Sequence, residues 1–407
     1  MKRTVQCLVC ALWTVVLVLA CSASAGRPAG FTGLLVSPGP YPAAGQALAG
    51  RALYVLSGEA VEALDLSARP PRRLWRVTGA QAGPEPEIRA APGLVLILGE
   101  GRTIALDART GARRWQLETR LLHTVRRLGL AESPEGGIAG VDLASGRTLW
   151  VYPDSGAIQL DPSGTPVWPV RLLTVRDTPA PDGPCRVTPA YELVDPESGT
   201  VAARHPVSTG TCGFAAMYTP LELPGALTVI RRQHGTWLER LDPSTLRPLW
   251  TANQPSAANA ARVATCGAMF CLTRSDREGR ERLVVLDGGT GAERWSGSWR
   301  TTLVTAGGAL FRPPGRAGGA MLLDRAGQPR RDLGGWLPLA ALPGGRLVVQ
   351  DQGEGGWAGL LDPGTGSIRP LARLGVPVGG CQATAAHLSC FDDQDRLHVW
   401  ALGRTAG

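Results

Sequence analysis

The sequence predicts an all-β protein that folds as a single β-propeller of about eight four-stranded blades. Two observations favour this fold class. The 407 residues include 53 Gly and 33 Pro, too many for a helical protein, while 44% hydrophobic residues make the chain too apolar for disorder. In addition, one phrase recurs about every 42 residues and divides most of the chain into units of one blade each.

The recurring phrase is an apolar strand ending in Asp, a turn of small residues and a strand carrying Trp. Successive Asp residues lie 35 to 53 residues apart, around the period of a four-stranded blade. The Trp follows eight residues after the Asp in four units, which carry Asp107 and Trp115, Asp142 and Trp150, Asp242 and Trp250, and Asp287 and Trp295. The weaker copies carry Asp65 with Trp75 two residues late, Asp195, Asp324 and Asp362.

Each part of the phrase has a structural explanation. An Asp side chain can accept backbone N–H bonds from two residues further on, and the glycine after it supplies the positive φ that a tight reversal needs. We therefore expect the eight Asp residues to form hairpin turns between the two outer strands of each blade. The Trp side chains are expected to pack on the neighbouring blade, where the indole N–H can find a carbonyl.

The last unit of the chain is incomplete. After Asp362 a partial unit over residues 388–402 lacks its final strand, and the apolar N-terminal run 31–36 is a candidate to supply it. Pairing of the two chain ends would close the ring and remove the exposed edges. The total is eight or nine blades, depending on whether one weak copy is irregular, and we expect eight.

The phrase Leu-Asp-x-x-Thr-Gly-x-x-x-Trp resembles the PQQ-like repeat of quinoprotein propellers, and the resemblance extends from Gln46 to about Gly403. It implies the fold but not one function, because the same scaffold serves quinone-dependent dehydrogenases, the lipoprotein of outer-membrane barrel assembly and exported interaction modules. The dehydrogenases are longer and carry adjacent cysteines and a calcium site, whereas no two cysteines are adjacent here. We therefore expect no enzymatic activity and no cofactor.

The N-terminus reads as an export signal. Lys2 and Arg3 precede an uncharged apolar run over residues 5–20, which is short for a membrane span and is followed by small residues. Residues 18–21, Val-Leu-Ala-Cys, resemble a lipobox, while residues 23–25, Ala-Ser-Ala, fit ordinary cleavage. We favour the lipobox, with a signal over residues 1–21, a lipid on Cys21, a flexible tether and possible closing strand over residues 22–45, and the propeller over residues 46–403.

The cysteines are consistent with export. Three of the nine lie in the signal region, and an even set of six remains. Two pairs each frame a segment that reads as strand, turn and strand, so that cross-hairpin disulfides are plausible. The expected pairs are Cys266 with Cys271, Cys381 with Cys390 and, as the remainder, Cys185 with Cys212. Fifteen connectivities stay open for six cysteines.

The sequence gives little support for a metal site or a nucleic-acid partner. No His has another His two or four residues away, and the group of Asp392, Asp393 and Asp395 lacks the spacing of a calcium loop, so that a hairpin turn is favoured. The formal net charge of +8 comes almost entirely from Arg, which is scattered among acidic residues. We therefore expect no nucleic-acid partner.

The function hypothesis is a monomeric, non-enzymatic binding or scaffold propeller. It would be lipid-anchored at the outer face of the cell membrane and recruit an envelope protein, a peptide or a small ligand. Secretion or a periplasmic location without the lipid is the alternative for localisation. The alternatives for function are a small quinone-dependent dehydrogenase and the sensor domain of an envelope signalling system.

Overall fold

The structure is a computed structural model. It describes residues 31–36, 45–80, 83, 86–125, 127–152, 172–179, 187–195, 197–206, 217–223, 226–232, 236–242, 244–254, 262–266, 269–275, 281–297, 300–305, 308–312, 320–324, 329–342, 345–351 and 356–402. Over these residues, no helix is long and apolar enough to cross a membrane.

The described residues form antiparallel sheets whose strands follow the chain order. The first four sheets hold β2 (Gly45–Ala49), β3 (Ala52–Ser57), β4 (Ala60–Asp65) and β5 (Arg72–Val77); β6 (Glu87–Ala91), β7 (Leu94–Gly99), β8 (Arg102–Asp107) and β9 (Arg113–Leu117); β10 (Leu121–Val125), β11 (Leu128–Glu132), β12 (Ile138–Asp142) and β13 (Thr148–Tyr152); and β14 (Leu172–Pro179), β15 (Val187–Val194) and β16 (Val201–Pro206).

The next four sheets hold β17 (Met217–Leu223), β18 (Ala226–Arg232), β19 (Thr236–Leu241) and β20 (Pro248–Gln254); β21 (Arg262–Cys266), β22 (Met269–Ser275), β23 (Glu281–Asp287) and β24 (Glu293–Gly297); β25 (Arg300–Thr305), β26 (Gly308–Arg312), β27 (Met321–Leu323) and β28 (Pro329–Asp332); and β29 (Trp336–Ala341), β30 (Leu347–Asp351), β31 (Trp357–Asp362) and β32 (Ser367–Arg373). The last sheet combines both ends of the chain and holds β33 (Val378–Ala383), β34 (His387–Asp392), β35 (Leu397–Leu402) and β1 (Phe31–Val36).

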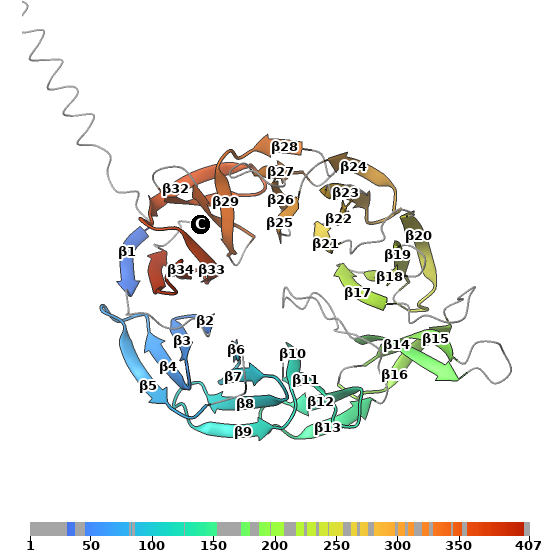
Figure 1. The fold of residues 1–407 in the computed structure, drawn as a ribbon, viewed down its shortest axis with the longest axis horizontal. Coiled ribbons are helices and arrows are strands. Elements are labelled where there is room, and N and C mark those ends of the chain that lie inside the picture. The colour runs from blue at the N-terminus through green and yellow to red at the C-terminus, as the bar shows by residue number, and fades with distance from the viewer. Residues whose placement is uncertain are drawn as a thin grey trace, which may run out of the picture.

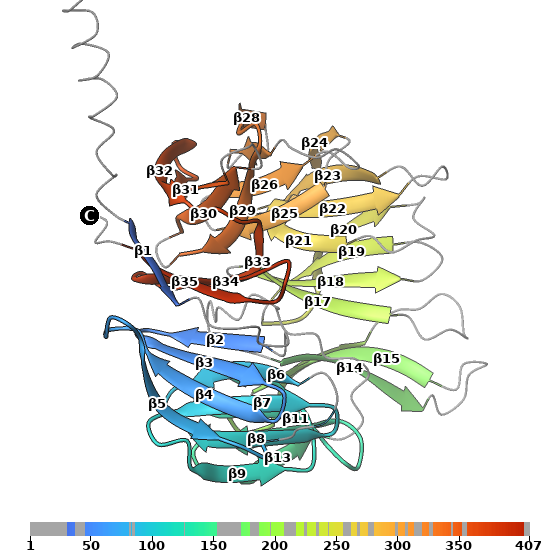
Figure 2. The same cartoon turned by 60° about the vertical axis from the view of Figure 1, so that its left-hand side comes forward.

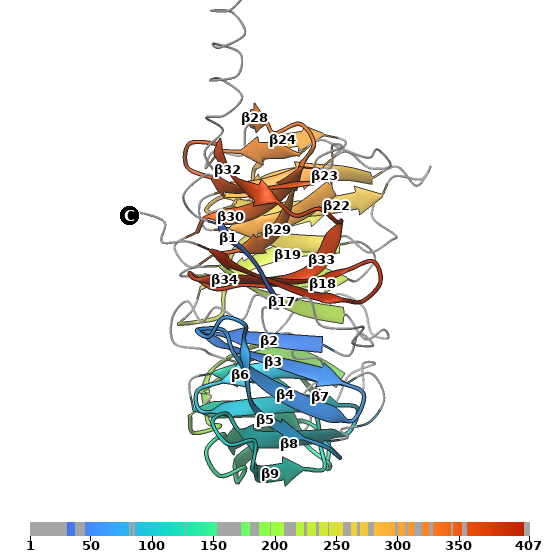
Figure 3. The ribbon, with the colours of Figure 1, turned by 90° about the vertical axis from the view of Figure 1, so that its left-hand side faces the viewer.

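The sheets are arranged around a common centre (Figure 1). The first strand of a sheet, such as β6 or β17, lies toward the centre, and the last strand, such as β9 or β20, lies on the outside. We call β2–β5 the first sheet and β33, β34, β35 and β1 the closing sheet. Seen from the side, the first sheet lies directly below the closing sheet (Figure 3), and β2 contacts β33.

The all-β prediction is confirmed, but the expected count of eight blades is not. The described residues form nine sheets, because the unit after Asp362 is a sheet of its own and not an irregular part of a neighbour. This unit lacks the Asp turn before its outer strand, since that strand comes from the other end of the chain. One sheet, β14–β16, has three strands among the described residues where the prediction has four.

The hydrophobic core lies between neighbouring sheets. The middle strands are apolar on both faces because each one is covered by a sheet on either side. In β7 all six residues, Leu94–Gly99, are buried. Its Val95 and Ile97 pack with Tyr54 and Ala63 of the first sheet, while Leu96 and Leu98 pack with residues of β10–β13 such as Leu121. The outer strands keep only the residues that face a neighbour buried, as Trp115 in β9 illustrates.

The N-terminal strand pairs with the last strand of the chain, as the sequence predicts. β1 lies antiparallel to β35, with Phe31 opposite Leu402 and Leu34 opposite Trp400 (Figure 2). The register shifts twice along this short pair. The strand thereby covers the outer edge of β35, which would otherwise be free to pair with another chain.

Removal of β1 tests this pairing. A chain that begins at residue 45 is expected to unfold at a Tm lower by at least about 2 °C and to aggregate more readily, because β35 becomes an open edge. Thermal unfolding and light scattering measure both effects. A chain that begins at residue 31 keeps the strand and serves as the control. Equal Tm values for the two chains would mean that the pairing contributes nothing to stability.

Candidate functional site

The Asp residues of the repeated phrase organise the outer turns. Asp107 shows the full arrangement: its Oδ1 accepts hydrogen bonds from the backbone N–H groups of Arg109 (3.0 Å) and Thr110 (2.8 Å) and from the Thr110 hydroxyl (2.9 Å). Its Oδ2 accepts two hydrogen bonds from the Arg114 guanidinium, the shorter at 2.6 Å. One carboxylate, both of whose oxygens accept hydrogen bonds, therefore stabilises the turn.

The same bond, from the N–H two residues on to the Asp carboxylate, recurs along the chain. It is present at Asp65, Asp107, Asp142, Asp195, Asp242, Asp287 and Asp362. Asp324 lies at the end of its strand, but the turn after it falls outside the described residues. Asp392 forms a related turn between β34 and β35, in which it accepts from the N–H groups of Gln394 and Arg396, so that it acts as a hairpin turn.

These hydrogen bonds lower the pKa values of several turn carboxyl groups, among them Asp107, Asp242 and Asp287. The Arg114 side chain, followed by Thr110, holds the pKa of Asp107 well below its usual range. The Ser244 hydroxyl and neighbouring N–H groups lower the pKa of Asp242 to about 2, and Arg294 with Thr290 does the same for Asp287. Each shift reflects donors that bind the ionised form and lose their partner when it is protonated.

The Trp side chains connect each sheet to the turn of the next sheet. The indole N–H groups of Trp75, Trp115 and Trp250 donate to the carbonyls of Ala108 (3.1 Å), Leu143 (2.7 Å) and Gly288 (3.2 Å). Each acceptor is the residue directly after the turn Asp of the following sheet. Of the other two predicted packing residues, Trp150 lies against Gly199 of the next sheet. Trp295 packs against a buried cluster that includes Met269, and Met321 of the next sheet packs against the same cluster.

The turn glycine lies under the indole and has no room for a side chain. Gly146 has φ +71°, and a Cβ placed there would come within 2.6 Å of the Trp115 ring. Gly111 and Gly199 meet Trp75 and Trp150 in the same way, at 2.7 and 2.6 Å. Glycine is thus required for two reasons. Its backbone adopts the left-handed conformation, and it leaves room for the close approach of the indole.

The three-stranded sheet departs from this pattern. Ala203 occupies its Trp position. The next turn has Leu246, buried and at φ 57°, where the turns after Asp107, Asp142 and Asp195 have glycine. Buried polar pairs serve this sheet instead. The Tyr152 hydroxyl donates to Glu192, and the Tyr191 hydroxyl donates to Glu239 over 2.9 Å.

These tyrosines and glutamates were not predicted from the sequence. Burial raises the pKa of Glu192, and the ion pair with Arg204 opposes that rise. A usable signal was present, because Glu62, Glu192 and Glu239 each stand three residues before a repeat Asp, on strands whose remaining inward positions are apolar. A glutamate at that place in an apolar strand requires a partner from a neighbouring strand or sheet.

The junction between the first sheet and the closing sheet is polar. We call it the closing junction. The buried Gln46 on β2 donates from Nε2 to the carbonyls of Gly380 (2.8 Å) and Ser389 (3.2 Å) and accepts from the Ser389 hydroxyl. In return, Gln382 accepts from the Leu48 N–H and donates to the Gln46 carbonyl, both at 2.8 Å. A hydrophobic cluster that includes Leu53 and Leu397 lies between the same two sheets.

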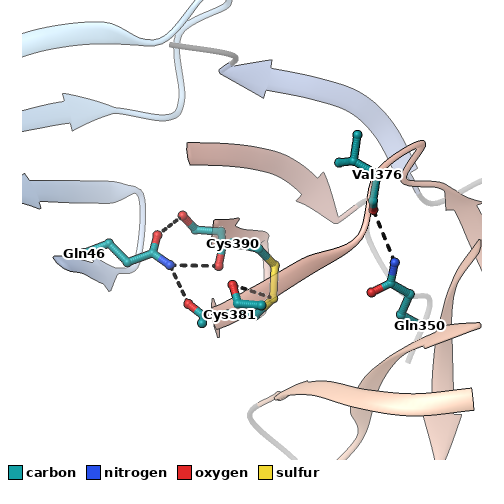
Figure 4. The surroundings of a disulfide bond; sticks show 8 residues. Gln46, Gln350, Val376, Cys381 and Cys390 are labelled. Atoms are coloured by element: carbon teal, nitrogen blue, oxygen red, sulfur yellow. Dashed lines mark hydrogen bonds between the residues drawn. A yellow bond between two sulfur atoms is a disulfide. The ribbon is translucent and has the colours of Figure 1, made fainter. Parts of the chain in front are cut away.

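A disulfide stands beside the closing junction. Cys381 on β33 is bonded to Cys390 on β34, next to the Gln46 side chain (Figure 4). Cys271 is also disulfide-bonded, and the side chain of Cys266, its predicted partner, lies outside the described residues. The predicted pair Cys185 and Cys212 and the predicted lipid site Cys21 also lie outside them.

The polar side chains of the repeated turns and of the closing junction thus make contacts within and between sheets. Among these residues, no group of three or more His, Cys, Asp or Glu is placed to hold a metal ion. Of the two histidines of the closing sheet, His398 pairs with Asp392 (2.8 Å), and His387 lies near the Gly50 carbonyl of the first sheet (3.4 Å). What this arrangement can do is hold a rigid ring whose faces and outer strands are available for contacts.

These features define a repeat protein in which several neighbouring sheets are joined by a Trp of one sheet and an Asp turn of the next. Residues 57–213 match the family model described as outer membrane protein assembly factor BamB. The resemblance of the repeated phrase to PQQ-like propeller repeats is thereby confirmed for this segment. A search of curated proteins gives no match.

Solved structures resemble the chain in fold. A crystal structure of a eukaryotic initiation factor has a TM-score of 0.54 at 11% identity and covers 88% of this chain and 97% of its own. BamB from Moraxella catarrhalis has 0.45 at 16% identity, with 91% and 100% covered. A quinohemoprotein alcohol dehydrogenase from Pseudomonas putida has 0.45 at 11% identity, with 91% and 76% covered.

A pair of glycine substitutions tests the contact between indole and turn. Gly146→Ala is expected to destabilise the protein by about 1–3 kcal/mol more than Gly136→Ala. Both glycines have positive φ, but a Cβ at Gly136 meets nothing within 4 Å, whereas at Gly146 it meets the Trp115 ring. The midpoint of urea unfolding measures the difference. Equal midpoints for the two variants would show that the Trp115 indole moves aside without loss of stability.

From the turn carboxyl groups of Asp242 and Asp287 we expect a loss of stability in acid. Their pKa values are lower in the folded chain than in the unfolded chain, so their contribution is present above about pH 4 and is lost as the pH falls toward 2. Tm, measured by circular dichroism, should fall across this window. The double variant Asp242→Asn and Asp287→Asn keeps acceptor oxygens without titrating, so its Tm should fall less. A fall identical to that of the parent would count against this origin.

Proposed function

We propose that the protein is a non-enzymatic scaffold of the cell envelope that recruits a protein partner. The observation that carries this proposal is the match of residues 57–213 to the family model of an outer membrane protein assembly factor. The described geometry supports it, because the repeated Asp, Trp, Tyr and Glu side chains serve the ring itself and leave a rigid frame. More specifically, we propose that this scaffold acts in the assembly of outer-membrane proteins.

The ring in this proposal has nine blades and is closed by the pairing of β1 with β35. Contacts join neighbouring sheets on both sides of the closing sheet, β29 with β33 and β2 with β33, and at other junctions such as β2 with β6 and β17 with β21. Such closure would place the two chain ends side by side and would give the scaffold a fixed diameter. A scaffold of fixed shape presents its partner with preorganised surfaces, which lowers the entropic cost of binding.

We further propose that the ring is held close to a membrane by a lipid on Cys21. Because β1 begins at Phe31, only residues 22–30 separate Cys21 from the ring. Nine residues span at most about 30 Å when extended. The tether is thus shorter than the 22–45 segment expected from the sequence, and partners would be found within this distance of the membrane surface.

The anchor and the assembly role can be tested together in the organism that encodes the protein. The intact mass of the exported chain is expected to correspond to an acylated Cys21, and deletion of the gene is expected to lower the amount of folded outer-membrane protein. The wild-type gene should restore that amount, and Cys21→Ser should restore it only partly because the ring is no longer held at the membrane. Mass spectrometry and quantification of the outer-membrane fraction provide the measurements.

Three outcomes would contradict parts of this proposal. An unmodified chain that begins near Gly26 would remove the anchor. Unchanged outer-membrane protein levels would remove the assembly role and leave the more general scaffold. Saturable binding of pyrroloquinoline quinone with calcium, coupled to reduction of a dye, would instead favour the quinone-dependent dehydrogenase.

A further inference from the structure

We infer that the Cys381–Cys390 disulfide is a redox-controlled clamp on the closing junction, which a dithiol reductant opens without unfolding the ring. This inference concerns regulation of the ring and does not depend on the proposed function. It rests on where the disulfide lies in the strand register, on what hydrogen-bonds beside it and on which of its two sulfurs is within reach.

The disulfide spans a gap in the β33–β34 ladder. Gly379 pairs with Phe391, and Gln382 pairs with Ser389, so that Gly380 and Cys381 together stand opposite the single residue Cys390. This is a β-bulge, in which the regular strand pairing is interrupted. Gly380 has φ +58°, in the left-handed region. The covalent bond therefore joins the two strands where their backbone pairing is weakest.

The closing junction depends on the shape of this bulge. The Gly380 carbonyl accepts a hydrogen bond from Gln46 Nε2 at 2.8 Å, and Gln382, at the end of the bulge, makes both return bonds to β2. Gln46 is also hydrogen-bonded to Ser389 on β34, so that its one side chain contacts both strands of the bulge (Figure 4). A change in the spacing of β33 and β34 must break one set of these bonds.

The two sulfurs differ in exposure. Cys390 is fully buried, while Cys381 is half-buried and lies among the exposed residues Gly379, Gly380 and Gln382. A reductant can therefore approach Cys381 from the open side of β33, whereas Cys390 is shielded by the cluster that includes Leu388 and Trp400. Accessibility of one sulfur is sufficient for thiol–disulfide exchange.

The reaction balances with a dithiol as the reductant. A thiolate of the dithiol attacks Cys381 Sγ, the Cys381–Cys390 bond breaks, and Cys390 leaves as a thiolate that takes up a proton. The second thiol of the reductant then attacks the mixed disulfide, releases Cys381 as a thiol and closes a disulfide in the reductant. Two electrons and two protons pass to the protein. Any Cys-x-x-Cys protein of the envelope belongs to this class of reductant.

The strand pairs that hold the rest of the closing sheet do not involve the disulfide. β35 stays paired with β34 and β1, and the clusters on both sides of the sheet keep Leu388, Val399 and Trp400 buried. Reduction therefore releases β33 and the Gln46 hydrogen bonds, while the remaining strands keep their places. The expected result is a local opening between β2 and β33.

Hydrogen–deuterium exchange on the full chain tests the clamp. After treatment with dithiothreitol under native conditions, and with both thiols verified by alkylation and mass spectrometry, amide exchange in residues 45–50 and 378–383 should be at least about tenfold faster. Exchange in residues 94–107, on the strands β7 and β8, should be unchanged. The variant Cys381→Ser with Cys390→Ser should show the fast exchange without dithiothreitol and should not respond to it.

The variant Gln46→Ala tests whether the hydrogen bonds of the closing junction, and not the disulfide alone, limit exchange there. Gln46→Ala keeps the disulfide but loses the hydrogen bonds of its side chain, so its exchange in residues 45–50 should already be fast in the oxidised state. Failure of dithiothreitol to reduce the pair in the folded chain would overturn the inference. Reduction with unchanged exchange in residues 45–50 would overturn it as well, as would faster exchange throughout the chain.

Discussion

The arrangement of the sheets depends on one contact that recurs at four junctions of the described residues, the indole of one sheet lying on the turn glycine of the next. The turn and the indole belong to the same repeated phrase, so a sheet that carries both offers a turn to the sheet before it and a Trp to the sheet after it. A lone unit would leave its Trp exposed, and only a neighbour can cover it. The hydrogen bond from the indole N–H to a turn carbonyl sets the orientation of each pair of sheets.

Where this contact is missing, the structure uses other residues in its place. The three-stranded sheet has Ala203 at the Trp position, and the following turn carries the buried Leu246 in the left-handed conformation that glycine adopts elsewhere. A leucine side chain fits there because no indole occupies the space. At a later turn the Arg331 side chain lies over Gly366, and Arg330 donates to the Gly364 carbonyl. The pairing of glycine with a large neighbour is thus a steric rule of this ring.

Local features of the fold could be predicted from the sequence, and contacts between distant residues could not. The Asp turns and the Trp contacts are visible because turn chemistry and spacing repeat along the chain. The expected count of eight blades is not confirmed, because the last unit, which has no Asp before its outer strand, forms a sheet of its own. Gln46 and Gln382 carry no local signal, since their roles arise only when residues more than 330 positions apart meet. Glu239 is visible as a glutamate in an apolar strand, but its partner Tyr191 lies on the neighbouring sheet and carries no signal of its own.

Under the proposed location in the cell envelope, the pairing of β1 with β35 also has a consequence for the order of events during synthesis and export. A protein that crosses a membrane from its N-terminus presents residues 31–36 first and residues 397–402 last. β1, which emerges first, therefore stays unpaired until β35 emerges last. The sheets between them can form as their residues emerge. The ring is complete only when the entire chain has arrived on the same side, and a truncated chain is left with an open edge that cellular proteases can recognise.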